Sequence, residues 1–150
     1  MNNSQFIRNT ITIQASPAVV WDALTNPEQT KKYMFGCETV SDWKEGSPLL
    51  WRGHYEGKEM VFVKGHIVQI VPPIRLVYTT FDPHSIYADI PENYLTVTYT
   101  LEEDHGHTIL TVTQGDFTLV EGGEKRYQDA SNGGEGWNPI LAEIKKLLEQ

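Results

Sequence analysis

Hydrophobic and polar residues alternate along much of the chain, as they do in strands that bury one face. The clearest segment is 94–101, whose apolar residues at every second position are Leu95, Val97, Tyr99 and Leu101. The residues between them are threonines, which suits an antiparallel sheet with one solvated face. Residues 103–106 predict a hairpin turn, after which 108–115 pairs back with a covered set of Leu110, Val112 and Gln114.

The same alternation predicts further strands at 10–13, 49–56, 60–71 and 75–81. The covered side of 49–56 holds Trp51, Gly53 and Tyr55, and a turn is expected at Gly57-Lys58. The covered side of 75–81 holds Leu76, Tyr78 and Thr80. The alternation does not show which residues of 60–71 share a face, because Gly65 can mark a bulge that exchanges the two faces. The side chain of His66 can therefore lie on either face of the sheet.

Three segments predict helices. Ser16 can cap and Pro17 can begin a short helix over 18–24, and Asn26-Pro27 ends it and starts a second helix over about 27–34. The strongest amphipathic period comes last, with apolar residues three and four apart at Trp137, Ile140, Leu141, Ile144, Leu147 and Leu148. The stretch 121–136 before it is polar and glycine-rich, has no firm period, and is predicted to be a connection.

These elements predict an α+β fold in a single domain of residues 1–150. Their order is a strand, two short helices, about six further antiparallel strands and a long C-terminal helix. A sheet with one apolar face has to be covered, and the last helix is the only long amphipathic element. We therefore expect a curved antiparallel sheet that wraps round the C-terminal helix.

Charge, cysteine content and the lack of long apolar stretches predict which partners and which cellular compartment the protein has. The formal net charge is −8, and an acidic surface repels phosphate backbones and anionic lipid heads, so we expect neither nucleic acid nor membrane as a partner. Cys37 is alone, which excludes an intrachain disulfide and predicts a small, partly buried hydrophobe. Residues 1–16 lack the apolar core of a signal peptide, and no stretch approaches the ~18 apolar residues of a membrane span, so we expect a cytoplasmic protein.

The sequence offers no strong catalytic or metal motif. The five histidines lack a metal-ligand spacing, and His105 and His107 flank a predicted hairpin tip. Gly133–Gly136 before a helix lacks the strand, the glycine spacing and the lysine of a phosphate-binding loop. No serine or cysteine nucleophile motif is present. We therefore predict no metal, no cofactor and no catalytic residue.

Aromatic residues are abundant, at 11% of the chain, and many fall on the faces predicted to meet the last helix. The predicted wall of a binding cavity consists of Trp51, Tyr55, Tyr78, Leu95, Val97, Tyr99, Gln114, Trp137 and Leu141. Buried Tyr and Gln groups need hydrogen-bond partners, which a ligand or a trapped water can supply. The alternative is that these groups bond to one another across a dry core, and both interpretations remain open.

Several ordered segments resemble the START-related SRPBCC superfamily, in the branch of activators of the Hsp90 ATPase (AHSA-type). The segments are Pro17–Pro27, Gly46–Pro48 with Trp51 and Gly53, Gly65–Ile67, Pro72–Thr79, Pro91–Leu101, Leu110–Gln114, Gly136-Trp137 and Leu147–Glu149. The resemblance covers essentially the whole chain. It implies the helix-grip fold of birch-pollen-allergen-like proteins, in agreement with the layout predicted from the pattern.

Members of that superfamily include lipid or polyphenol carriers, aromatic cyclases and co-chaperone domains, so the resemblance implies several functions. The leading hypothesis is a binding protein that takes a small hydrophobic or aromatic molecule between the sheet and the C-terminal helix. The second is an interaction module that stimulates a heat-shock-protein ATPase, with a chaperone as partner. A third hypothesis, a cyclase or dehydratase, needs an acid–base pair that faces the interior. Among the histidines, only His66 is placed where its side chain can face inward.

Overall fold

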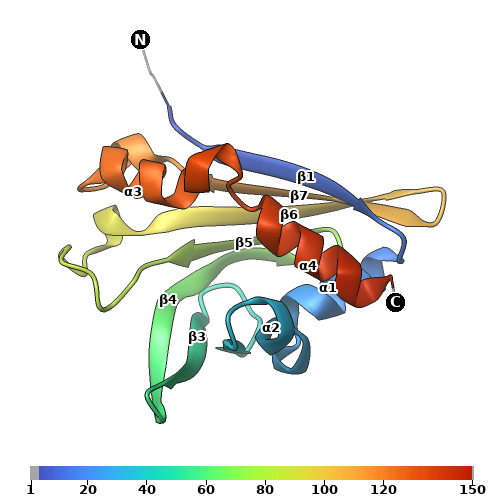
Figure 1. Cartoon of the computed structure of the whole chain (residues 1–150), viewed down its shortest axis with the longest axis horizontal. Helices are drawn as coiled ribbons and strands as arrows, with labels where there is room; N and C mark the ends of the chain where they lie inside the picture. The colour runs from blue at the N-terminus through green and yellow to red at the C-terminus, as the bar shows by residue number, and fades with distance from the viewer. Residues whose placement is uncertain (1–3, 150) are drawn as a thin grey trace.

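A seven-stranded antiparallel sheet spans the protein in the computed structural model, which describes residues 4–149. The strands are β1 (Ile7–Ile13), β2 (Glu38–Ser41), β3 (Pro48–Tyr55), β4 (Lys58–Val71), β5 (Arg75–Thr80), β6 (Leu95–Asp104) and β7 (His107–Gly115). Their spatial order is β1-β7-β6-β5-β4-β3-β2, so β1 pairs with the last strand and every other pair is formed by consecutive strands (Figure 1). The α+β class and the curved antiparallel sheet predicted from the sequence are confirmed.

Four α-helices accompany the sheet within residues 4–149, together with three short 3₁₀ turns. The helices are α1 (Pro17–Thr25), α2 (Pro27–Tyr33), α3 (Gly123–Ser131) and α4 (Asn138–Leu148), and the 3₁₀ turns are Pro91–Asn93, Phe117–Leu119 and Asn132–Gly134. Helix α4 crosses one face of the sheet, and α1 and α2 lie beside its C-terminal end (Figure 1). The predicted two short helices and the C-terminal helix are therefore present.

Local capping explains where α1 and α2 begin and end. The Ser16 hydroxyl accepts a hydrogen bond from the Val19 N–H, and Pro17 occupies the first turn, where no donor is needed. Asn26 ends α1, and its side chain accepts the Glu28 N–H at 3.0 Å, which caps α2. One asparagine thus forms the corner between two helices.

Three details of the predicted layout are wrong. Residues 121–136 contain α3, which was not expected because its sequence is mostly polar and offers no apolar stripe. The β3–β4 turn lies at Glu56-Gly57, where both residues have positive φ, one position earlier than predicted. Tyr55 is not on a covered face: it is 61% exposed, because it pairs with Lys58 beside that turn, at a hairpin end beyond the helices (Figure 1).

The long strand β4 contains two irregularities that settle its parity. Against β3 the register slips by one residue at Phe62, and against β5 it slips at Val68. Neither bulge falls on Gly65, which is instead a point of close approach: a Cβ there would lie 1.7 Å from the Thr79 carbonyl oxygen. Ile67 is fully buried and His66 is exposed, so His66 points away from the helices.

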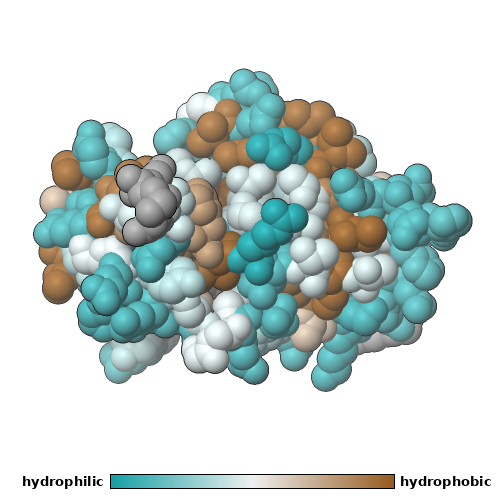
Figure 2. Space-filling view, turned by 90° about the horizontal axis from the view of Figure 1, so that it is seen from above, coloured by the Kyte–Doolittle hydropathy of each residue, from teal (hydrophilic) through white to brown (hydrophobic). Residues whose placement is uncertain are grey.

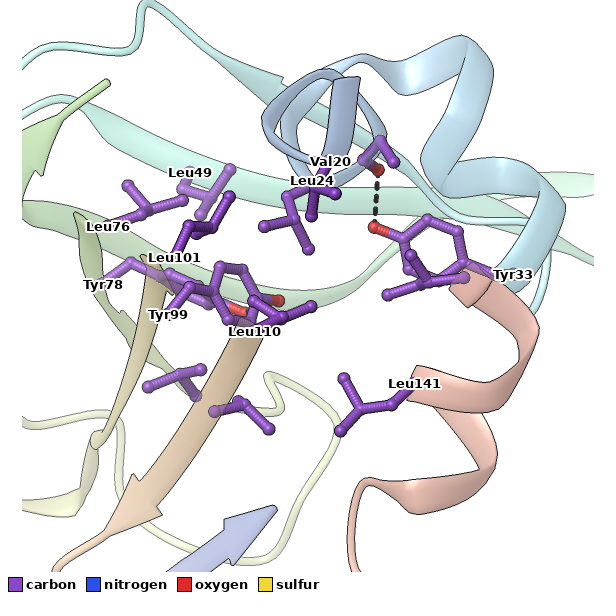
Figure 3. Close-up of a cluster of buried hydrophobic side chains, with 14 of the residues drawn as sticks. Val20, Leu24, Tyr33, Leu49, Leu76, Tyr78, Tyr99, Leu101, Leu110 and Leu141 are labelled. Atoms are coloured by element: carbon purple, nitrogen blue, oxygen red, sulfur yellow. Dashed lines mark hydrogen bonds between the residues drawn. The ribbon is translucent and has the colours of Figure 1, made fainter. Parts of the chain in front are cut away.

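The main core lies between the sheet and helices α1, α2 and α4 (Figure 3). Leu24 from α1 and Leu141 and Ile144 from α4 belong to the same buried cluster as Leu101 of β6 and Leu110 of β7, which are almost fully buried. The Tyr33 hydroxyl donates to the Ala23 carbonyl at 2.7 Å, which ties α2 to α1 inside the core. Burial raises the pKa of Tyr33 well above its ordinary value, so this hydroxyl stays a neutral donor.

The surface seen from the side of β1 and α3 is mostly hydrophilic, with hydrophobic residues gathered along one edge and others set among the polar residues (Figure 2). Among residues 4–149, no helix combines the length and the apolar character that crossing a bilayer requires.

The close approach at Gly65 generates a first prediction. Gly65→Ala should destabilise the protein by at least about 2 kcal/mol, because β4 and β5 must separate to admit a methyl group against backbone. Gly57→Ala is the control: Gly57 has φ +78° and open space around it, so its substitution should cost only about 1 kcal/mol. Urea unfolding measures both, and equal losses would contradict the steric argument.

Candidate functional site

A cavity of about 540 Å³ lies between the sheet and helices α3 and α4. Its position follows from the length of α4, which spans 11 residues, or about 16 Å. Strand β6 has 10 residues and extends about 34 Å, so α4 covers only part of the strand. The covered part is the packed core, and the cavity occupies the part nearer the start of β6.

Six of the residues predicted to form a binding wall line this cavity: Trp51, Tyr78, Leu95, Val97, Gln114 and Trp137. Sheet register explains why residues far apart in sequence meet. Tyr78 of β5 pairs with Val97 of β6, which pairs with Gln114 of β7, so the three form one row across the covered face.

Two buried hydroxyls meet beside the cavity. The Tyr78 and Tyr99 oxygens are 2.7 Å apart, and both side chains are 1% exposed. Burial raises the pKa of both phenols above the ordinary value, so both stay protonated at neutral pH. The aromatic contacts continue on either side, from Trp51 to Tyr78 at 6.3 Å and from Tyr99 to Trp137 at 6.1 Å between ring centroids. The two tyrosine hydroxyls are thus each other's hydrogen-bond partners, as the dry-core interpretation expects.

Trp137 is held in place from two directions. Its indole Nε1–H donates to Gln114 Oε1 at 2.9 Å, and its backbone N–H donates to Asn9 Oδ1 at 2.9 Å. Gly136 makes this approach possible, since a Cβ at that position would lie 2.6 Å from Asn9 Oδ1. Gln114 therefore positions an aromatic wall, and its amide oxygen already has a donor.

Three residues of the predicted wall lie elsewhere. Tyr99 and Leu141 belong to the packed core behind the cavity. Tyr55 is at the exposed β3–β4 hairpin end. Position on a covered face was correctly predicted for Tyr99 and Leu141, but the alternation does not show how far along each strand the helix reaches.

Sequence reasoning missed much of the lining: Met34, Phe35, Cys37, Phe62, Val63, Thr80, Phe81, Asp82, Arg126, Ala130, Gly136 and Ile140. Phe62 and Val63 are consecutive in β4, and the bulge at Phe62 brings both to the cavity. Arg126 and Ala130 are one helical turn apart on α3, the helix that the polar sequence did not reveal. Cys37, which was predicted to be partly buried, is 6% exposed, and burial raises the pKa of its thiol.

The lining is mainly apolar, and two of its side chains are formally charged at neutral pH, Asp82 and Arg126. Asp82 is the second residue after the end of β5 and is exposed, and Arg126 is on α3 and is half-buried, so both are accessible to solvent and mark a mouth of the cavity. Within the described part of the chain, no three His, Cys, Asp or Glu side chains come together as metal ligands would. This arrangement can enclose an apolar molecule and contact one polar end of it.

Comparison with known proteins places the chain among relatives of the same fold. The family model described as "Activator of Hsp90 ATPase homolog 1-like protein" matches residues 14–149. A solution structure of a protein from Cytophaga hutchinsonii is 38% identical, with a TM-score of 0.75 over 99% of this chain and 97% of that one. No curated protein matches the chain.

Two more distant structures share the fold. The Aha1 dimer from Colwellia psychrerythraea is 18% identical, with a TM-score of 0.70 over 97% of this chain and 96% of that one. An HSP90 activator from Plasmodium falciparum is 19% identical, with a TM-score of 0.66 over 95% of each chain. At these identities the likeness shows the architecture alone.

The tyrosine pair generates a second prediction. Tyr78→Phe and Tyr99→Phe should each lower the free energy of unfolding by about 1 to 2 kcal/mol, because each leaves a buried hydroxyl without its partner. The double variant should lose less than the sum of the two, since it removes both polar groups. Tyr94→Phe is the control, because the Tyr94 hydroxyl bonds to Asp89 at the surface. Strict additivity in urea unfolding would contradict the direct pairing.

Proposed function

The chain belongs to the family of activator of Hsp90 ATPase homolog 1-like proteins, and within that family we propose that it is a carrier or receptor for a small hydrophobic or aromatic molecule, held in the cavity between the sheet and helices α3 and α4. The observation that carries the proposal is the cavity of about 540 Å³, lined mostly by apolar and aromatic side chains. Cavities that bind small molecules are typically about 300–1,000 Å³ and have such linings.

The surroundings of the cavity support this proposal. The rigid walls, Trp51 and Tyr78 on the sheet and Trp137 before α4, are fixed by packing and hydrogen bonds, so little entropy is lost on binding. Two polar groups of the sheet wall have partners within the protein: the Tyr78 hydroxyl pairs with the Tyr99 hydroxyl, and the Gln114 side-chain oxygen accepts from Trp137. An apolar ligand therefore does not have to break either of these two contacts.

Binding of a neutral apolar probe tests the proposal. N-phenylnaphthylamine, whose emission rises in apolar surroundings, should bind the folded protein and quench Trp51 or Trp137. Ala130→Phe, which places a larger side chain in the cavity, should weaken binding by about tenfold or more. Ala142→Phe is the matched control, because Ala142 is exposed on α4 and does not line the cavity. Absence of probe binding, or equal binding by the two variants, would contradict the proposal.

The family match supports a second candidate function, stimulation of an Hsp90-type ATPase. Such an activity would use an outer surface, so it should not depend on an open cavity. Adding the purified chain to the Hsp90 of its host should then raise the rate of ATP hydrolysis, and Ala130→Phe should raise it equally. An unchanged rate of ATP hydrolysis at saturating protein would contradict this second function. Loss of stimulation in Ala130→Phe would show that the stimulation depends on the cavity.

A further inference from the structure

One cationic side chain, Arg126, lines the cavity. Arg126 is half-buried, lines the cavity together with Ala130, and has its guanidinium carbon 4.9 Å from the centroid of the Tyr87 ring. That ring packs on Gly122, where a Cβ would lie 2.4 Å from the Tyr87 hydroxyl. The loop after β5 and the first turn of α3 therefore hold the guanidinium in a defined place.

A second contact joins the same two segments. The Asn93 side-chain oxygen accepts the Glu121 N–H at 3.0 Å, and its amide nitrogen donates to the Ala88 carbonyl at 2.9 Å. Asn93 is 2% exposed, so these bonds are partly shielded from water. The position of Arg126 is thus supported by packing and by partly buried hydrogen bonds.

The guanidinium has unused binding capacity. Its Nη1 donates one long hydrogen bond, 3.4 Å, to the Glu121 carbonyl, and none of the ion pairs among residues 4–149 includes Arg126. An arginine has five N–H donors arranged to bind a planar oxyanion. Partial burial lowers the pKa of Arg126, and nearby Tyr87, Asp82 and Glu121 oppose that effect without cancelling it, so a bound anion would offset the remaining cost of desolvation.

Asp82 is the other charged residue of the lining, and its position differs. It is exposed, and its Oδ1 accepts the His84 N–H at 2.8 Å, so water and a backbone donor already solvate it. The half-buried cation interacts more strongly with a bound charge than the exposed carboxylate does. The remaining negative charge of the protein is screened beyond about 8 Å at physiological ionic strength.

We propose that the ligand is an amphiphile with an anionic head, of which a long-chain carboxylate is the simplest form, and that Arg126 binds the head while the apolar body lies against Trp51, Phe62 and Trp137. This inference rests on the proposed function of the cavity and adds the chemical class and the orientation of its ligand. The head lies at the mouth, where water can solvate it further, and the body fills the apolar interior.

Three ligands that differ only in the head group test this assignment. Dodecanoic acid, dodecanol and dodecylamine compete with N-phenylnaphthylamine, each below the concentration at which it forms micelles. The acid should displace the probe at a concentration about tenfold lower than the alcohol, since a charge-assisted hydrogen bond is worth about that factor. The amine should bind more weakly than the acid.

Two neighbouring substitutions separate a local contact from a general charge effect. Arg126→Gln should weaken acid binding about tenfold and leave alcohol binding unchanged, which also shows that the cavity remains intact. Lys125→Gln removes the same charge from the adjacent position of α3, where Lys125 pairs with Asp129 outside the cavity, and should change neither affinity.

The outcomes distinguish this inference from the function on which it rests. If the probe does not bind, the cavity function itself fails. If the probe binds but the acid and the alcohol compete equally, or the amine competes best, or none of the three competes, the anionic-head assignment is overturned and the apolar cavity stands. An acid preference that survives Arg126→Gln or disappears in Lys125→Gln also overturns it.

Discussion

The fold depends on covering the single apolar face of a curved sheet with helices shorter than its strands. Helices α1, α2 and α4 cover the part of β6 and β7 around Leu101 and Leu110 and complete a packed core there. The chain breaks between α3 and α4, at Asn132 and Gly133, where both residues have positive φ. The two helices therefore meet the sheet as separate short elements, and the apolar surface between them encloses a cavity.

Hydrogen bonding decides what that cavity can accept. Buried tyrosine and glutamine side chains normally require partners, which made a polar ligand one possible explanation of the inward Tyr78, Tyr99 and Gln114. The structure pairs Tyr78 with Tyr99 and Gln114 with Trp137. The two tyrosine hydroxyls and the Gln114 side-chain oxygen thus have partners within the protein, and the rest of the wall is mainly apolar. A molecule that matches this distribution is apolar over most of its length.

Much of the fold could be predicted because the alternation in 94–101 and 108–115 fixes which side chains share a face. Register then aligns Tyr78, Val97 and Gln114, which were correctly assigned to one side. Alternation reports direction only, so it could not show that Tyr55 lies beyond the helices or that Tyr99 is enclosed in the core. The bulge at Phe62 and the polar helix α3 follow from tertiary packing, and the lining residues they contribute could not be predicted.

The residues missed by sequence reasoning are those that give the site its chemistry. A helix with an apolar stripe would have been found, but it would also have packed tightly on the sheet and filled the space. Helix α3 is polar, and it contributes Ala130, which is small, and Arg126, which is long and reaches the mouth. The composition that hides α3 in the sequence therefore also keeps the cavity open and places a cation at its entrance.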